Sequence, residues 1–284
     1  MKKLCAVLSA LLALAALLTG CEKKQPETAE EEGAPLRVTF FDVGKGDCIL
    51  LEQDGAFMMI DAGYDETSGD VIAFLEEQGA TALEALIITH YDKDHVGGAA
   101  AVVNAVPVKQ VYLPGYEGHS KYYTALMKAL VENDLPYRQV KEDVSFALSG
   151  VSIAVYASAV EYVYDGTKEG NDNNVSLVIA ASYGQDSYLF AGDLEKAGIS
   201  AYLEAGRGAF DVVKMPHHGS KKKNTDDFIA DVQPKIAVIT DSAADPAEAE
   251  TLELLADAGA DVYRTGQLGT VVITSTGRGT YSVS

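Results

Sequence analysis

Four of the five histidines in the chain lie in two short polar motifs. The first motif, Thr-His-Tyr-Asp-Lys-Asp-His, places His90, Asp92, Asp94 and His95 within six residues, where an apolar strand gives way to a helix. Side chains this close on one turn can converge on one point, and imidazole nitrogens with carboxylate oxygens suit Zn²⁺ and Mn²⁺. Helix capping alone would explain the aspartates, but it needs neither histidine.

Two further motifs also follow apolar strands. The motif Met-Pro-His217-His218 comes directly after the run 211–214, and Asp193 follows the run 187–190. Loops at strand ends often carry binding and catalytic groups. Asp193 on its own could equally cap the next helix. Together, the three motifs predict one metal centre.

Short apolar runs that alternate with helical patterns must position these motifs. Runs rich in Val, Ile, Tyr and Phe predict strands at Leu36–Asp42, Cys48–Gln53, Phe57–Ile60, Ala85–Thr89, Gln110–Leu113, Val151–Tyr156, Val175–Ala181, Ser187–Phe190, Asp211–Lys214, Ile236–Thr240, Asp261–Arg264 and Thr270–Thr274. Helical patterns predict helices at Ser68–Gln78, Val96–Ala105, Tyr122–Asn133, Glu195–Ala205, Thr225–Asp231 and Ala247–Ala258. This order suggests two sheets faced by helices, although periodicity alone does not separate it from a single mixed sheet.

The N-terminus has the pattern of an export signal. Lys2 and Lys3 precede the apolar run 4–18, which is too short for a stable spanning helix. The run ends Leu-Thr-Gly-Cys21, which resembles the lipobox of bacterial lipoproteins. That resemblance implies cleavage before Cys21 and a lipid anchor that holds the protein outside a bacterial membrane. An ordinary cleaved signal or an uncleaved anchor is the alternative. We expect a signal peptide at 1–20, a polar tether at 21–35 and a folded domain at 36–284.

Composition fits a globular protein, with 48% apolar residues and a formal net charge of −20. A chain this acidic repels nucleic acid and anionic lipid on average. Lys214 and the lysines at 221–223 flank the second histidine motif, so they could supply local positive charge for phosphates. Cys5 lies in the leader and Cys21 has another role, so we expect no internal disulfide and a buried, hydrophobe-like Cys48.

The first motif resembles the His-x-His-x-Asp-His signature of the metallo-β-lactamase superfamily, with Asp92 in place of the second histidine. The replacement resembles the branch formed by the soluble domain of ComEC-like competence DNA-uptake proteins and their free-standing relatives. Other stretches match that branch in order: 41–47 (FDVGKGD), 60–63 (IDAG), 173–177 (NNVSL), 192–193, 217–220 (HHGS) and 263–270 (YRTGQLGT). The resemblance spans Leu36 to the C-terminus and implies an α/β fold, the αββα four-layer sandwich, for a hydrolase domain.

The resemblance also implies two divalent metal ions, Zn²⁺ or Mn²⁺. The implied ligand set is His90, Asp92, Asp94, His95, Asp193, His217 and His218. The first two residues would hold one ion, the next two the other, and Asp193 would bridge them. One histidine of the pair would complete the set, with His218 favoured. The superfamily's usual middle histidine has no counterpart here, so one ion site could be weak or empty.

Other residues are expected to act around the ions. Asp94 and Asp193 are the candidate catalytic residues, with Asp94 placed to orient the attacking water or pass on its proton. Asp42 and Asp61 are expected to orient the ligand histidines through hydrogen bonds. The candidate substrate-binding residues are Asn173, Asn174, Ser176, Ser220 and Lys221, and the first three stand near the position of the missing ligand.

A pair of metal ions suits hydrolysis of a phosphodiester, an ester or an amide. The resembled domain is associated with DNA degradation, so a phosphodiesterase or nuclease acting on DNA or another phosphodiester is the first hypothesis. A hydrolase of a small-molecule ester or amide, β-lactams included, is the second. A non-enzymatic lipoprotein that binds nucleic acid or a partner is the third. The sequence names no protein partner.

Overall fold

The computed structural model describes residues 33–166 and 170–284, and a compact unit runs from Ala34 to Ser284. The predicted signal peptide, the lipidated Cys21 and nearly all of the tether lie outside the described residues and stay predictions. Within the described ranges, no helix combines the length and apolar character needed to cross a membrane.

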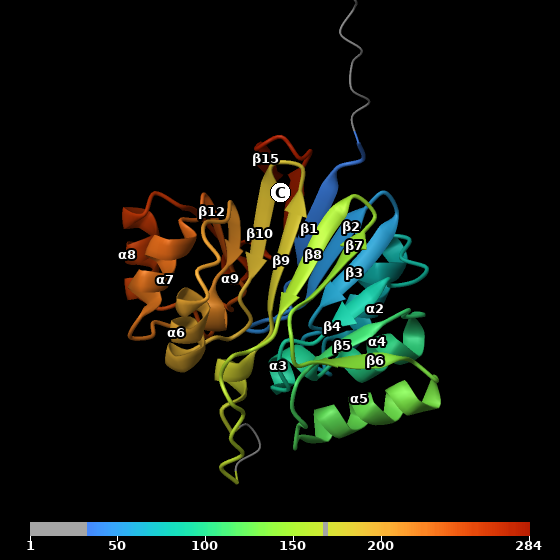
Figure 1. The fold of residues 1–284 in the computed structure, drawn as a ribbon. Helices are drawn as coiled ribbons and strands as arrows, with labels where there is room; N and C mark the ends of the chain where they lie inside the picture. Colours follow the sequence, from blue (N-terminus) through green and yellow to red (C-terminus); the bar gives the residue numbers. More distant parts are fainter. Residues whose placement is uncertain (1–32, 167–169) are drawn as a thin grey trace, which may run out of the picture. The chain divides into compact units, whose positions relative to one another are not determined.

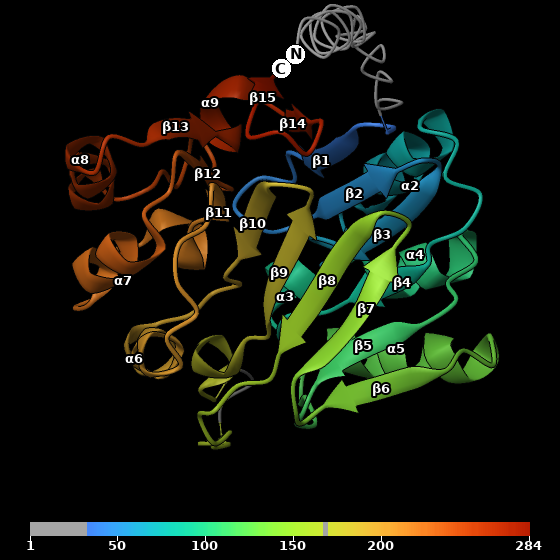
Figure 2. The ribbon, with the colours of Figure 1, turned by 45° about the horizontal axis from the view of Figure 1, so that its top comes forward.

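Two mixed sheets form the centre of this unit (Figures 1 and 2). The larger sheet has the order β15-β14-β1-β2-β3-β4-β5-β6. Its strands are β1 (Leu36–Phe40), β2 (Ile49–Gln53), β3 (Ala56–Ile60), β4 (Ala85–Ile87), β5 (Val111–Pro114), β6 (Tyr137–Val140), β14 (Val271–Ser275) and β15 (Tyr281–Val283). The smaller sheet has the order β13-β12-β11-β10-β9-β8-β7. Its strands are β7 (Val144–Leu148), β8 (Val151–Tyr156), β9 (Val178–Tyr183), β10 (Asp186–Phe190), β11 (Val212–Lys214), β12 (Ile236–Ile239) and β13 (Asp261–Arg264).

Helices cover the outer face of each sheet (Figure 2). The larger sheet packs against α2 (Ser68–Glu77), α4 (Ala99–Ala105) and α5 (Lys121–Glu132). The smaller sheet packs against α6 (Lys196–Glu204), α7 (Thr225–Val232) and α8 (Ala249–Asp257). Shorter helical turns are α3 (Lys93–Val96), η2 (Asp172–Val175), η3 (Pro216–Gly219) and α9 (Thr265–Leu268). The layers run helix, sheet, sheet, helix, so the predicted αββα sandwich is confirmed.

The central strands are apolar on both faces because each sheet is buried on both sides. On β2, Ile49 and Leu51 enter the core between the sheets, whereas Leu50 enters the core under the helices. On β10, Phe190 points into the inter-sheet core and Leu189 points towards the outer helices. Successive strand side chains point to opposite faces, so these runs read as continuous apolar stretches in the sequence.

The sequence analysis missed three strands, β6, β7 and β15. In β6, the first two residues are exposed, and in β7 buried and exposed residues alternate, so neither has an apolar run. All three strands lie at an edge of a sheet, where a strand pairs with a neighbouring strand on one side only. Val175, predicted as the start of a strand, belongs to η2 instead. Cys48 is a buried free thiol within the core, as expected.

Candidate metal centre

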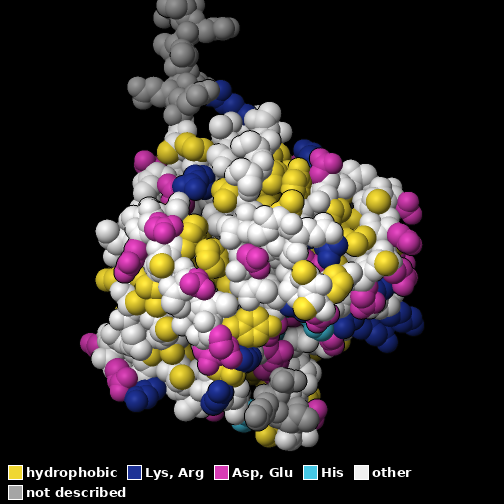
Figure 3. Space-filling view, turned by 180° about the vertical axis from the view of Figure 1, so that it is seen from behind, with side chains coloured by type: hydrophobic (Ala, Val, Ile, Leu, Met, Phe, Trp, Pro, Cys, Tyr) yellow, Lys and Arg dark blue, Asp and Glu magenta, His cyan; other side chains and the backbone are white. Residues whose placement is uncertain are grey.

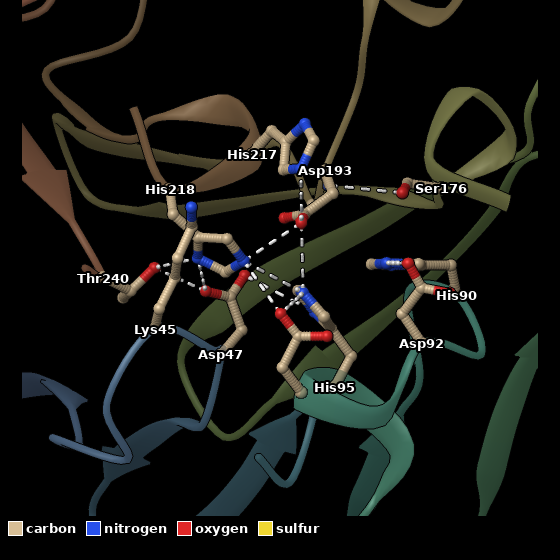
Figure 4. A network of polar contacts seen from close by, with 12 residues as sticks. Lys45, Asp47, His90, Asp92, His95, Ser176, Asp193, His217, His218 and Thr240 are labelled. Carbon is tan, nitrogen blue, oxygen red and sulfur yellow. Dashed lines mark hydrogen bonds and ion pairs between the residues drawn. The ribbon is translucent and has the colours of Figure 1, made fainter. Parts of the chain in front are cut away.

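The three polar motifs meet at one end of the two sheets (Figure 4). The first follows β4 and enters α3, Asp193 follows β10, and the histidine pair follows β11 within η3. Because β10, β11 and β12 pair in parallel, their carboxyl ends lie at the same edge. Loops that are far apart in the sequence therefore converge there.

The loop between β1 and β2 also reaches this edge, because Gly46 packs closely against the first histidine motif. A Cβ atom on Gly46 would lie only 2.7 Å from Asp94 O, so no larger residue fits there without a shift. The N–H of Asp47 donates to the same Asp94 oxygen (3.0 Å). The Gly-rich stretch 44–47 thus lies against the first histidine motif, which places the Asp47 carboxylate inside the cluster.

Four side chains each offer a ligand atom within 4.8 Å of the others: Asp94, His95, Asp193 and His218. Asp193 Oδ2 lies 3.0 Å from His218 Nε2 and 3.3 Å from His95 Nε2. Asp94 Oδ2 lies 3.3 Å from His218 Nε2. Three of these residues are buried, while the side chain of Asp94 is 24% exposed and forms the open side.

Hydrogen bonds to Nδ1 orient both imidazoles of this cluster. His95 Nδ1 lies 2.8 Å from Asp61 Oδ2, so Asp61 acts as expected from its position. Thr240 Oγ1 donates to Asp47 Oδ1 (2.6 Å) and therefore accepts from His218 Nδ1 (3.1 Å). Each histidine then keeps its proton on Nδ1 and turns Nε2 towards the carboxylates. This is the arrangement that metal-binding histidines adopt, so the residues fit a divalent cation.

His90 is oriented in the same way but belongs to a separate half-site. Its Nδ1 lies 3.0 Å from Thr89 Oγ1, which donates to Asp61 Oδ2 (2.6 Å). His90 Nε2 and Asp92 Oδ1 are buried without a hydrogen-bond partner in the described structure, and His90 Nε2 lies 3.6 Å from Asp92 Oδ2. Buried polar atoms are normally satisfied, so this pair also suits a cation. Among the described residues, no cluster of three or more candidate ligands includes either of them.

The structure separates the two histidines of the second motif. His218 lies in the cluster, whereas His217 is at its rim, with Nδ1 3.2 Å from Glu195 Oε1 and Nε2 3.9 Å from Asp193 Oδ2. Both histidines have left-handed backbone conformations, with φ of 47° and 52°. Such conformations cost free energy in residues other than glycine and persist where the surrounding structure imposes them.

The candidate substrate-binding residues occupy different surroundings. Asn174 Oδ1 accepts from the backbone N–H groups of Ala197 and Gly198 at the start of α6. Ser176 Oγ accepts from the Asp193 N–H (3.2 Å). The side chains of Asn174 and Ser176 thus hold the backbone at the start of α6 and at Asp193. Asn173 and Asn174 both line a pocket that Asp92 also lines.

Of the four lysines near the histidine pair, Lys214, Lys221 and Lys222 are paired with acids in the described structure, and Lys223 is exposed. Lys214 was expected to supply positive charge for phosphates, but it is buried inside the centre and faces Asp47 and Asp193 instead. Lys221 Nζ lies 3.4 Å from Glu250 Oε1, and Lys222 Nζ lies 2.8 Å from Glu195 Oε1. Ser220, two residues after the pair, is half-buried.

Two residues of the centre, Asp47 and Thr240, were missed as site residues in the sequence, and Lys214 was named only as a possible phosphate contact. Asp47 and Thr240 hold His218, and Lys214 contacts Asp47 and Asp193. Asp42 was expected to orient a histidine and does not, because it is exposed and accepts from the N–H of Gly44 in its own loop. Asp47, at the other end of this loop, orients His218 through Thr240. The Gly-rich motif around Asp47 was the feature of the sequence that could have identified it as a site residue.

Opposite charges dominate the electrostatics of the metal-free centre. Burial alone would lower the pKa of His95 and of His218, but neighbouring carboxylates, Asp193 first, outweigh burial and raise both pKa values. Burial would raise the pKa of Asp193, but His218 and His95 hold it well below its usual value. Burial would also raise the pKa of Asp94, but His95 outweighs burial and lowers this pKa.

These shifts predict that the metal-free protein loses stability as the pH rises above 6.5, the ordinary histidine pKa. Between that pH and the raised folded pKa values, the folded state binds protons that the unfolded state has released, so unfolding becomes easier with rising pH, by up to about 1.4 kcal/mol per pH unit for each histidine. The aspartates contribute stability above 3.8 and lose it as the pH falls through their lowered folded pKa values. Urea unfolding in chelator from pH 5 to 9 measures this, and a flat profile above pH 6.5 would contradict it.

The chain is similar to several known proteins. Residues 41–240 match the family described as the metallo-beta-lactamase superfamily. ComE operon protein 3 of Bacillus subtilis is 28% identical over 270 residues, which cover 87% of this chain and 34% of that protein. Recombination protein 2 of Haemophilus influenzae is 26% identical, over 74% of this chain and 25% of its own length. Competence protein ComA of Neisseria gonorrhoeae is 25% identical, over 80% of this chain and 30% of its own length.

The chain therefore spans between 25% and 34% of the length of these relatives. Among solved structures, the metallo-beta-lactamase fold protein YhfI from Bacillus subtilis superposes with a TM-score of 0.55 at 10% identity, covering 85% of this chain and all of that one. This likeness concerns the fold. Because the family match covers well over half of the chain and includes all three motifs, the chain belongs to the metallo-beta-lactamase superfamily.

Proposed function

We propose that the protein is a metal-dependent hydrolase that cleaves phosphodiester bonds, most simply those of DNA. The cluster of Asp94, His95, Asp193 and His218, with both Nε2 atoms turned inward, is the observation that carries the proposal. Its contacts with Asp61 and Thr240 prepare it for a cation before any cation binds.

The four residues of the cluster would hold a divalent ion, Zn²⁺ or Mn²⁺, and the half-site of His90 and Asp92 would hold a second, weaker one. A bound ion would supply Lewis-acid chemistry and make water a better nucleophile near neutral pH. Asp94, the most exposed acid of the cluster, orients the attacking water and accepts its proton. Asp193 is buried and neutralised by its neighbours, so it holds the cluster together and leaves proton transfer to Asp94.

The proposed substrate class rests on the names of the relatives, and the acidic net charge of the chain limits how strongly it can attract a nucleic acid. Their names include competence and recombination proteins, which favours a nucleic-acid substrate. The chain carries a net charge of −20, and beside the histidine pair Lys221 and Lys222 are paired with Glu250 and Glu195. On the face seen in Figure 3, acidic side chains are scattered widely, while basic ones gather in small groups. We therefore expect contacts at the scissile phosphate to dominate binding, with little attraction along a duplex.

A direct assay tests the activity. The purified chain with Mn²⁺ or Zn²⁺ is expected to hydrolyse single- or double-stranded DNA, and Asp94→Asn should reduce the rate by about 100-fold or more, within the usual range for a general base. Nitrocefin and simple esters serve as alternative substrates. Hydrolysis of one of these without hydrolysis of DNA would reassign the substrate. Less than one equivalent of bound metal after reconstitution would instead favour a binding lipoprotein.

We further propose that the chain is exported and anchored outside a bacterial membrane through Cys21. The proposal rests on the lipobox-like ending of the leader. Incorporation of labelled palmitate that disappears in Cys21→Ser would support it, whereas labelling that persists in that variant would exclude Cys21 as the anchor.

A further inference from the structure

Lys214 is the last residue of β11, and its side chain is fully buried in the centre. Its Nζ lies 2.5 Å from Asp47 Oδ2, 2.9 Å from Gly192 O and 3.3 Å from Asp193 Oδ1. Three oxygens match the three N–H donors of an ammonium group. Lysine is almost never fully buried unless it is paired. The fold thus contains a three-oxygen cation site that one of its own side chains fills.

The ammonium group divides the two oxygens of Asp193 between different partners. Oδ1 faces Lys214, while Oδ2 faces the Nε2 atoms of His95 and His218. With Oδ1 engaged, only Oδ2 is turned towards the cluster that would hold a divalent ion. Asp193 therefore offers Oδ2 to a metal ion in the cluster, while Lys214 keeps its second oxygen engaged.

The same ammonium group also contacts the residue that orients His218. Asp47 Oδ2 faces Lys214, and Asp47 Oδ1 accepts from Thr240, whose hydroxyl holds His218 Nδ1. Because carboxylate oxygens of Asp47 and Asp193 face the ammonium group, a divalent ion that shared Asp193 Oδ1 with it would be repelled strongly in this buried site.

We propose that Lys214 is a positioning residue whose ammonium group fills this three-oxygen site and restricts the centre to one tightly bound divalent ion per chain. The separate half-site agrees with this, since His90 and Asp92 join no candidate ligand cluster that includes Asp193 among the described residues. The inference rests on the metal site of the proposed function and is independent of its substrate.

Counting bound ions in the full chain tests the inference. Metal-free wild type titrated with Mn²⁺ and examined by native mass spectrometry and calorimetry is expected to bind one ion tightly and a second at least tenfold more weakly. Lys214→Met keeps most of the side-chain volume but removes the charge, which frees Asp193 Oδ1. We expect this variant to bind the second ion at least tenfold more tightly than wild type does.

Two control variants separate charge from structure. Lys214→Arg keeps the charge and should keep the single tight ion. Lys235→Met removes a lysine that pairs with Asp211 on the surface (2.6 Å), and it should also bind as wild type does. If Lys214→Met is unfolded without metal, its melting temperature against Mn²⁺ concentration should follow two ions where wild type follows one.

Three results would overturn the inference. Two equally tight ions in wild type would show that the ammonium group does not limit the centre. A less stable Lys214→Met with unchanged ion binding would make the lysine a structural residue only. No bound ion in any variant would remove the metal site itself, whereas a wild type that binds one ion but cleaves no DNA leaves the inference intact and rejects only the substrate.

Discussion

Asp193→Asn is expected to abolish tight metal binding and to lower hydrolysis by more than about 100-fold, beyond the 10- to 100-fold typical of residues that only support metal ligands. Asp193 Oδ2 lies within 3.3 Å of both imidazole Nε2 atoms, and Asp193 Oδ1 faces Lys214. Asparagine has the same shape but no charge, so the centre loses the anion that all three cationic groups share. Calorimetry with Mn²⁺ or Zn²⁺ and the DNA hydrolysis rate measure the two effects.

Asp186→Asn provides a matched control for this variant. Asp186 begins the same strand, β10, and is buried, but it accepts from the N–H groups of Gly277 and Gly279 far from the centre. It should lower the free energy of unfolding and leave metal affinity unchanged. Metal affinity of Asp193→Asn equal to that of wild type would exclude Asp193 as a ligand and with it the cluster described here.

The local part of the site could be predicted because its residues are neighbours in the chain. Asp94 and His95 lie on one turn after a strand, and any fold that forms this corner brings them together. The histidine pair and Asp193 follow strands that pair in parallel, so their convergence follows from the fold class. The resemblance of the motifs supplied that fold class, which periodicity left open.

The supporting contacts could not be predicted because they join distant elements. Thr240 donates to Asp47 across 193 positions of the sequence, and Lys214 reaches the same carboxylate from the other sheet. No spacing rule relates such residues. Lys214 looked like a surface lysine because its chemical type favours solvent, and only its oxygen partners explain its burial. Asp42 and Asp47 stand in one motif, and the path of the loop alone decides which of them enters the centre.

Asp61→Asn is expected to weaken metal binding by about 10- to 100-fold, as removal of a histidine's orienting partner usually does. Asp61 Oδ2 accepts from His95 Nδ1 and from Thr89 Oγ1, which in turn contacts His90, while Oδ1 accepts from the Thr89 N–H (2.7 Å). An asparagine amide offers a single acceptor oxygen to these three donors. The loss of charge-assisted hydrogen bonds should also lower the free energy of unfolding by about 2–3 kcal/mol.

The matched control is Asp42→Asn, since both aspartates lie at strand ends in the N-terminal motifs and only one enters the centre. Asparagine tolerates positive φ, so the left-handed backbone at Asp61 (φ 54°) adds no strain of its own in that variant. Asp42 is exposed, and its replacement should change stability by less than about 0.5 kcal/mol. Urea unfolding of the metal-free proteins and Mn²⁺ titration separate the two effects. If Asp61→Asn were destabilised yet bound Mn²⁺ like wild type, Asp61 would support the fold alone, and the orientation of His95 would have to come from the packing around its ring.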